Sequence, residues 1–225
     1  SSTRFAANES AKAGVPLVHL FREGRAAFTV LLWGVNFMNI LMLYTLSNWL
    51  PTLVAGMGYD TQTAVFVGTT LQVGGTIGTF GLAWLIAKRG FPPMLTATFA
   101  IAALSIAFIG HPAISLAVLF AIVFVAGWCV VGGQPGINAL SATFYPTYLR
   151  STGVGAGLGV GRIGAIVGPY VTGVLIAEQW TTQQLFWAAA VPAVISTVAM
   201  VMLWAVLKRN GVTAELGTPA ATLSH

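Results

Sequence analysis

The chain has 225 residues, of which 56% are hydrophobic and only 7% charged, and its mean hydropathy is +0.84. Because about a quarter of the residues of a soluble domain are charged, this composition predicts a protein whose solvent is lipid. The net charge of +5 does not indicate nucleic acid, because Lys and Arg stand singly or in pairs near the ends of apolar runs, as membrane topology requires. The single cysteine, Cys129, excludes a disulfide framework and a Cys-based metal site, and we expect no cofactor.

The first segment in chain order, residues 1–25, is polar and contains Arg4, Lys12, Arg22 and Arg25. We interpret it as a cytoplasmic linker. The chain starts with Ser1, without a Met, and shows no cleavable signal at that end. We therefore expect a fragment, or one half of something longer.

Six apolar stretches follow within residues 26–207, which we predict to be a six-helix transmembrane domain, and residues 208–225 form a polar cytoplasmic tail. A helix needs about 20 residues to cross a bilayer. The stretches run over residues 26–50 (ending at Pro51), 63–87, 93–110, 113–140, 152–177 and 185–207. The sequence thus predicts an all-α polytopic membrane protein with six transmembrane helices, and not an enzyme.

The charges between the stretches alternate. Lys88-Arg89, Arg150 and Lys208-Arg209 fall on the same side as the N-terminal arginines, whereas the opposite loops carry no Lys or Arg but Asp60, His111 and Glu178. Since cytoplasmic loops are enriched in Lys and Arg, both termini are predicted to lie in the cytoplasm.

Glycines recur at spacings that favour close helix packing. Gly-x-x-x-Gly pairs occur at 74/78, 153/157, 157/161 and 164/168, and small residues let helices approach closely in lipid. We interpret most of these glycines as packing or hinge positions. Residues 159–164 also match G-x-G-x-x-G, but a dinucleotide site needs a preceding strand and a soluble βαβ unit, which this sequence does not offer.

Arg162 is the only charge that the sequence places inside an apolar helix. A charge at the bilayer centre costs roughly 2.5–3.5 kcal/mol and usually faces a bundle interior or a wet cavity. We favour an anion site, because the guanidinium fork matches a carboxylate. The alternative is a structural arginine that pairs with a helix C-terminus or reaches the interface. For Arg150, in the cytoplasmic turn, a topology and helix-capping charge is the favoured interpretation.

Two groups of amides are further candidates. Gln134 and Asn138 lie four residues apart, on one helical face, around Pro135, which loosens a helix. They either contact a substrate hydroxyl or bond between helices, at about 0.6 kcal/mol on average, and the sequence leaves both open. Asn36 and Asn39 belong to an unusually polar, aromatic first stretch and are candidates to line a cavity.

That same stretch also holds Tyr44, and it ends at Trp49, which we expect to be an interfacial anchor. No stretch contains Asp, Glu or His, the residues from which proton relays are built. Proton coupling would therefore need an acid elsewhere.

Five blocks of sequence form a recognisable set: residues 49–52, 132–140, 145–146, 152–155 and, most specifically, 159–169. Together with the six spans they resemble the C-terminal half of a major facilitator superfamily transporter. In detail they resemble the aromatic acid:proton symporters, which take up 4-hydroxybenzoate, benzoate and protocatechuate. The resemblance covers residues 26–207.

The resemblance implies one half of a 12-helix fold in the cell inner membrane, which imports an aromatic carboxylate with a proton by alternating access. The substrate would bind between this half and a missing N-terminal six-helix half. Arg162 matches the family's membrane-embedded arginine, and Arg150 the arginine of the preceding cytoplasmic turn.

The chain departs from the family at two places. The family's Asp-Arg pair after the second span, which helps close the cytoplasmic gate, corresponds to Ala87 and Lys88, followed by Arg89. Ala156 stands where a bulky aromatic often occurs. The gate charges and the cavity are therefore expected to differ. The alternative functions are a carrier for another small metabolite, such as a sugar or a dicarboxylate, and a non-transporting fragment.

Overall fold

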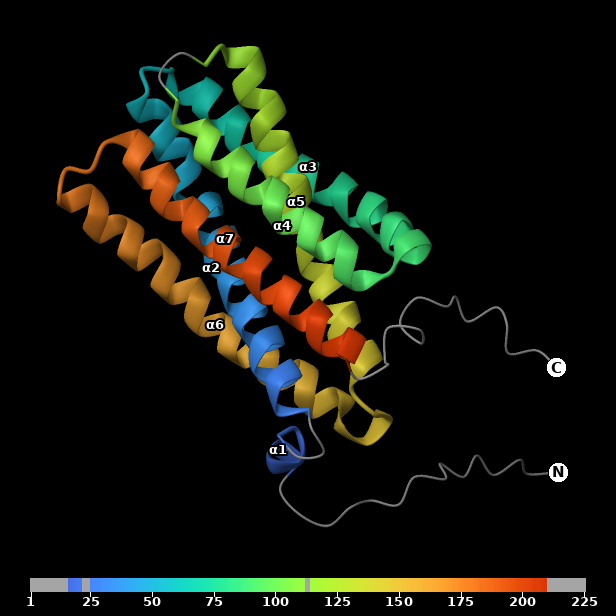
Figure 1. The fold of residues 1–225 in the computed structure, drawn as a ribbon. Helices are drawn as coiled ribbons and strands as arrows, with labels where there is room; N and C mark the ends of the chain where they lie inside the picture. The colour runs from blue at the N-terminus through green and yellow to red at the C-terminus, as the bar shows by residue number, and fades with distance from the viewer. Residues whose placement is uncertain (1–15, 22–24, 112–113, 210–225) are drawn as a thin grey trace, which may run out of the picture.

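The computed structural model describes residues 16–21, 25–111 and 114–209, and these contain helices and no strand. Six helices are long and apolar enough to cross a membrane, which confirms the predicted all-α fold with six spans. A single-turn helix, α1, lies inside the predicted linker. The helices are α1 Pro16–His19, α2 Ala26–Gly56, α3 Thr61–Arg89, α4 Phe91–Ile109, α5 Leu116–Phe144, α6 Thr147–Ala177 and α7 Thr182–Arg209 (Figure 1).

The helices pack as two related sets of three. The most extensive contacts join α3 to α5, α2 to α6 and α4 to α7, and α2 also packs on α7 as α5 does on α4. Exchanging α2–α4 for α5–α7 therefore reproduces the same pairs. Phe28, near the start of α2, stacks on Phe144, at the end of α5, so the equivalent helices run in opposite directions. This is an inverted repeat of three helices.

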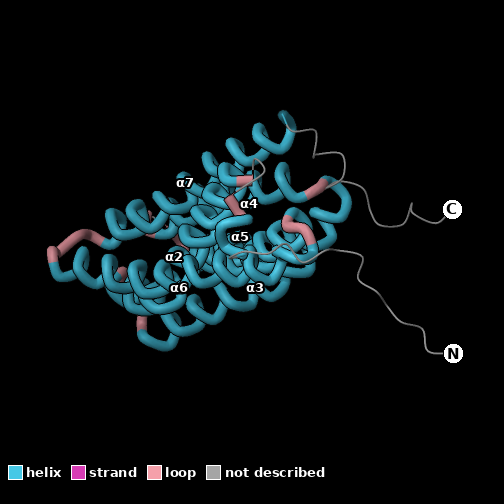
Figure 2. The backbone as a smooth tube through the Cα atoms, turned by 90° about the horizontal axis from the view of Figure 1, so that it is seen from below, coloured by secondary structure: helices cyan, strands magenta, loops and turns pink. Residues whose placement is uncertain are grey.

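The connections between the long helices are short (Figure 2). Gly90 alone separates α3 from α4, and its φ of 82° is one that glycine adopts without strain. Residues 145–146 separate α5 from α6. We call the end of the bundle at which α2 begins the basic end, because it holds six described Lys and Arg residues: Arg25, Lys88, Arg89, Arg150, Lys208 and Arg209 (Figure 1).

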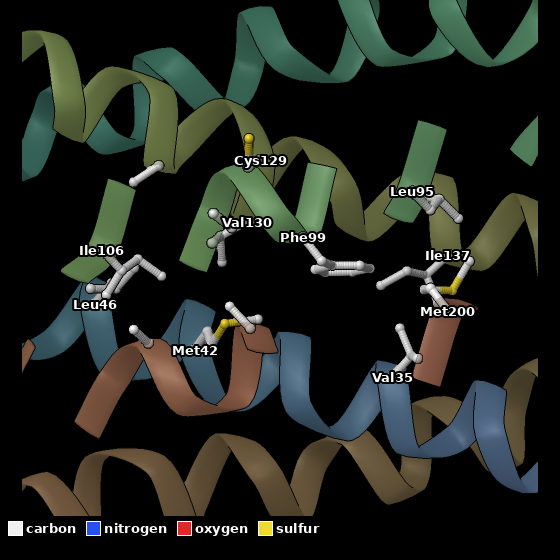
Figure 3. Packing of buried hydrophobic residues seen from close by; sticks show 14 of the residues in the cluster. Val35, Met42, Leu46, Leu95, Phe99, Ile106, Cys129, Val130, Ile137 and Met200 are labelled. Carbon is white, nitrogen blue, oxygen red and sulfur yellow. The ribbon is translucent and has the colours of Figure 1, made fainter. Parts of the chain in front are cut away.

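The buried core fills the space between α2, α4, α5 and α7. Figure 3 shows Met42 of α2, Phe99 of α4, Val130 of α5 and Met200 of α7 converging there, and all four are at most 1% exposed. Between helices in lipid such packing replaces the hydrophobic drive that operates in water.

Glycines set the distance between the main helix pairs, as predicted. A Cβ on Gly164 of α6 would lie 2.6 Å from the backbone oxygen of Phe37 in α2, and one on Gly78 of α3 would lie 2.6 Å from the Cα of Trp128 in α5. The backbones of α2 and α6, and those of α3 and α5, come into contact because glycine has no side chain at these positions. Not every glycine packs in this way, since a Cβ on Gly159 would meet nothing within 4 Å.

The predicted end of the first span at Pro51 was wrong, because α2 continues through this proline to Gly56. A proline inside a helix loses one hydrogen bond and crowds the preceding turn, but here its ring packs where Gly68 of α3 has no side chain. Helix α6 begins at Thr147, five residues earlier than predicted. Helix α5 is continuous through Pro135, as the predicted fourth span was. The predicted start of the fourth span, Ala113, lies outside the described residues.

Candidate functional site

Four of the predicted site residues form one cluster of amides between α2, α5 and α6. Gln134 of α5 is its centre: its Nε2 donates to Asn36 Oδ1 at 2.7 Å and to Asn138 Oδ1 at 3.4 Å, and its Oε1 accepts from Asn39 Nδ2 at 2.7 Å. The sequence left open whether these amides contact a substrate or bond between helices. The structure shows that they form hydrogen bonds between α2 and α5.

The same cluster is joined to the backbone at two points. Asn36 Nδ2 donates to the carbonyl oxygen of Gly157 in α6 at 2.6 Å, and Asn39 Nδ2 donates to that of Val130 in α5 at 3.2 Å. Asn36 is 4% exposed and Asn39 fully buried, whereas Gln134 is partly exposed. Sequence reasoning missed both carbonyls, because glycine and valine carry no polar side chain that would mark them.

Arg162 lies in the middle of α6, with Thr147 15 residues before it and Ala177 15 residues after it. At 1.5 Å per residue it is about 22 Å from either helix end, so its side chain reaches neither end of α6. The guanidinium is solvent-accessible in the isolated chain, and within the described residues its one hydrogen bond is from Nη1 to the hydroxyl of Tyr44 at 3.4 Å. Helices α2–α7 contain no Asp or Glu that would neutralise it.

Tyr44 was noted in the sequence as part of a polar, aromatic helix but was not selected as a site residue. Its partner is 118 residues away, and only the packing of α2 on α6 brings the two together. Trp49 lies half-buried against α6, where its Nε1 donates to the carbonyl oxygen of Pro169 at 3.0 Å, and its role as an interfacial anchor stays a prediction. Asn36, Tyr44 and Trp49 thus join α2 to α6 at three levels.

The basic residues that we assigned to gating lie at the basic end but within helices. Lys88 and Arg89 form the last turn of α3, where cations complement the helix dipole, and Lys88 Nζ lies 3.6 Å from the centroid of the Trp84 ring. The predicted capping role of Arg150 was wrong. It lies in the first turn of α6, where the helix dipole disfavours a positive charge.

A comparison with protein-family models identifies the fold. The model described as Major Facilitator Superfamily matches residues 32–223. The chain belongs to this superfamily. The inverted repeat of α2–α4 and α5–α7 is the arrangement known for each six-helix half of its members.

Several curated transporters are similar to the chain. The 4-hydroxybenzoate transporter PcaK of Pseudomonas putida is 34% identical over 174 residues, which are 77% of this chain and 39% of that protein. The benzoate transport protein of Acinetobacter baylyi is 33% identical over 192 residues, or 85% of this chain and 41% of that protein. The gallate transporter of Pseudomonas putida is 30% identical over 99% of this chain and 48% of its own length. The chain therefore spans less than half the length of these relatives, and its resemblance to aromatic acid transporters is confirmed.

Proposed function

We propose that the chain is the C-terminal half of a secondary transporter that imports an aromatic carboxylate, such as 4-hydroxybenzoate or benzoate, by proton symport. In this proposal it pairs with an N-terminal six-helix half in the cell inner membrane, both termini are cytoplasmic, and the substrate binds between the halves. The named substrates of the relatives, 4-hydroxybenzoate, benzoate and gallate, all combine a benzene ring with a carboxylate.

The observation that carries the proposal is the state of Arg162. A guanidinium in the middle of a 31-residue apolar helix, with only a neutral phenol as partner among the described residues, is an incomplete charge pair. A substrate carboxylate completes it, because two parallel N–H···O bonds match the guanidinium fork. Such a bond is worth more in a site that excludes water, where the effective dielectric constant is low.

In this proposal the proton needs a carrier outside helices α2–α7. Helices α2–α7 contain no Asp, Glu or His, so none of them offers a side chain that exchanges a proton near neutral pH. We place the proton-carrying acid in the other half, which leaves this half to hold the anion and to rock against its partner during alternating access.

The test is uptake of labelled 4-hydroxybenzoate by cells that make the full-length gene product, with and without a protonophore. The proposal expects uptake that the protonophore abolishes and that excess benzoate inhibits but a sugar or an aliphatic dicarboxylate does not. Inhibition by the sugar or the dicarboxylate instead would identify a carrier for another metabolite. Protein present in the membrane without uptake of any of these would contradict transport of this substrate class.

Arg162 is tested in the same assay. Hydrogen bonds to charged groups contribute about 1.5–3 kcal/mol, so Arg162→Gln is expected to lower uptake by about 10- to 150-fold. Arg162→Lys keeps the charge but loses the planar fork, and it should recover only part of the activity. Full activity of Arg162→Gln towards every carboxylate would remove this residue from the site.

A further inference from the structure

The hydrogen bonds of the amide cluster have a fixed direction. The carbonyl oxygen of Gly157 can only accept, so Asn36 must turn its NH2 towards Gly157 and its oxygen towards Gln134. Gln134 must then give its NH2 to Asn36 and present its oxygen to Asn39. Asn39 donates its NH2 to this oxygen. The same NH2 also donates to the carbonyl oxygen of Val130, which can only accept. Two backbone carbonyls thus determine the orientation of three side-chain amides.

The consequence appears at Asn138. The NH2 of Gln134 also reaches the oxygen of Asn138, which directs the oxygen of Asn138 into the cluster. The Asn138 NH2 has no hydrogen-bond partner within the described residues, and the residue is only half-buried. Two amide groups of the cluster therefore have no partner within the described residues: the oxygen of Asn39, which is buried, and the NH2 of Asn138, which is partly exposed and is a donor.

Asn138 and Arg162 lie on opposite sides of the cluster. Helix α5 runs towards the basic end and α6 away from it, and Gln134 and Gly157 both contact Asn36. Asn138 is four residues beyond Gln134, or about 6 Å, and Arg162 is five residues beyond Gly157, or about 7 Å, at 1.5 Å per residue. Because helical side chains lean back towards the start of their own helix, each of these two leans along the bundle axis towards the level of the other.

We infer that Asn138 is a specificity-determining residue whose NH2 donates to a ring hydroxyl oxygen of the substrate, at the end of the ring opposite the carboxylate. Asn36 and Asn39 are positioning residues. Their hydrogen bonds fix the orientation of the Gln134 amide, and the Gln134 amide in turn fixes the orientation of the Asn138 amide. This inference rests on the proposed function for the identity of the substrate. The locked direction of the amides stands independently of it.

The direction is tested by a change that reverses one donor. In Gln134→Glu the carboxyl can donate to Asn36 only while it is protonated, and when ionised it faces the oxygen of Asn36. Purified full-length protein carrying this variant should melt at wild-type temperature at low pH. At high pH its melting temperature should fall below that of the wild type by about 4 °C or more, and its uptake should fall over the same pH range.

Gln72→Glu is the matched control. Gln72 Nε2 donates to the hydroxyl of Ser47 at 3.2 Å, and a hydroxyl can turn and donate instead, so ionisation of the new carboxyl leaves the bond intact. Its melting temperature should follow the wild type at every pH. If Gln134→Glu does not accumulate, Asn36→Asp provides the same test, because only a protonated carboxyl can donate to Gly157.

Asn138 is tested by comparing two substrates. Asn138→Ala should raise the KM for 4-hydroxybenzoate about 2- to 10-fold, since the lost bond is of ordinary strength, and should leave the KM for benzoate, which has no hydroxyl, unchanged. An equal change for both substrates would contradict the specificity role. A melting temperature of Gln134→Glu without pH dependence would contradict the locked direction, even if the wild type transports neither substrate.

Discussion

Arg162 and Tyr44 join the centres of two helices, since Nη1 of the arginine donates to the phenol oxygen at 3.4 Å. The bond ties α6 to α2 at the depth where Arg162 stands. Because a phenol is neutral, it steers the guanidinium without neutralising it, and the positive charge stays available to an anion.

Removing this hydroxyl should weaken uptake without abolishing it. A hydrogen bond of this kind contributes about 0.5–1.5 kcal/mol, so Tyr44→Phe is expected to raise the KM for the carboxylate about 2- to 10-fold. Tyr170→Phe is the control, because Tyr170 also lies in α6 but is 71% exposed and has no hydrogen bond within the described residues. Equal effects of the two variants would show that Tyr44 does not position Arg162.

Adding one methyl group to the contact between α2 and α6 should destabilise the protein. In Gly164→Ala the new Cβ would lie 2.6 Å from the oxygen of Phe37, and overpacking of this kind costs about 1–3 kcal/mol. Gly34→Ala places its Cβ where nothing lies within 4 Å, and alanine favours a helix over glycine. Thermal melting should therefore separate the two, with only Gly164→Ala falling below the wild type.

Tyr145 holds the start of the described chain against the turn between α5 and α6. Its hydroxyl donates to Thr29 Oγ1 at 3.2 Å, which donates to the carbonyl of Leu20 at 3.1 Å. Burial raises the pKa of the Tyr145 phenol, so it stays a neutral donor at physiological pH. Tyr145→Phe should lower the free energy of unfolding by about 0.5–1.5 kcal/mol.

Hydrogen exchange can locate that effect. Residues 16–21 should exchange faster in Tyr145→Phe than in the wild type, because the Thr29 hydroxyl that accepts from Tyr145 is the group that bonds the carbonyl of the fully buried Leu20. Tyr148→Phe, in the first turn of α6, loses no hydrogen bond within the described residues and should leave the exchange unchanged. Faster exchange in both variants would point to a general loosening of this end.

Asp60 caps the start of α3, and its contribution should disappear in acid. Its carboxylate accepts from the hydroxyl of Thr63 at 2.6 Å and from the backbone N–H of Thr63 at 3.1 Å, and these bonds hold the pKa of the carboxyl below its usual value. Because the pKa is lower in the folded than in the unfolded state, the stabilisation is present above the unfolded pKa and is lost as the pH falls through the folded one. The melting temperatures of wild type and Asp60→Ala should therefore converge on acidification.

The orientation of the helices can be measured by labelling single cysteines introduced after the native Cys129 has been replaced by alanine. Glu178 follows α6 at the end opposite the basic one, and Lys208 lies in the last turn of α7. With both termini in the cytoplasm, a membrane-impermeant maleimide should label Glu178→Cys in intact spheroplasts, but Lys208→Cys only after permeabilisation. The reverse pattern would invert the proposed topology.

The sequence was sufficient to predict where the six long helices lie in the chain, but not which residues of different helices contact one another. Hydropathy and length located six spans, because a lipid-facing helix must be apolar over its whole length, and Arg162 stood out because a charge there is costly. Pro51 misled the boundary prediction, since the compensating contact with Gly68 comes from another helix. The bond between Asn36 and Gln134 joins residues 98 apart, and no spacing rule within one helix reveals such a pair.

The bare contact between α2 and α6 limits how this protein can change. At Gly164 and Gly168 the smallest side chain is already present, and every substitution adds atoms to a place that has no room for them. Substitution on that face of α6 therefore lowers stability. The exposed side, at residues such as Leu158 and Ile166, does not carry this cost, so one helix combines a face that tolerates little change with one that tolerates more.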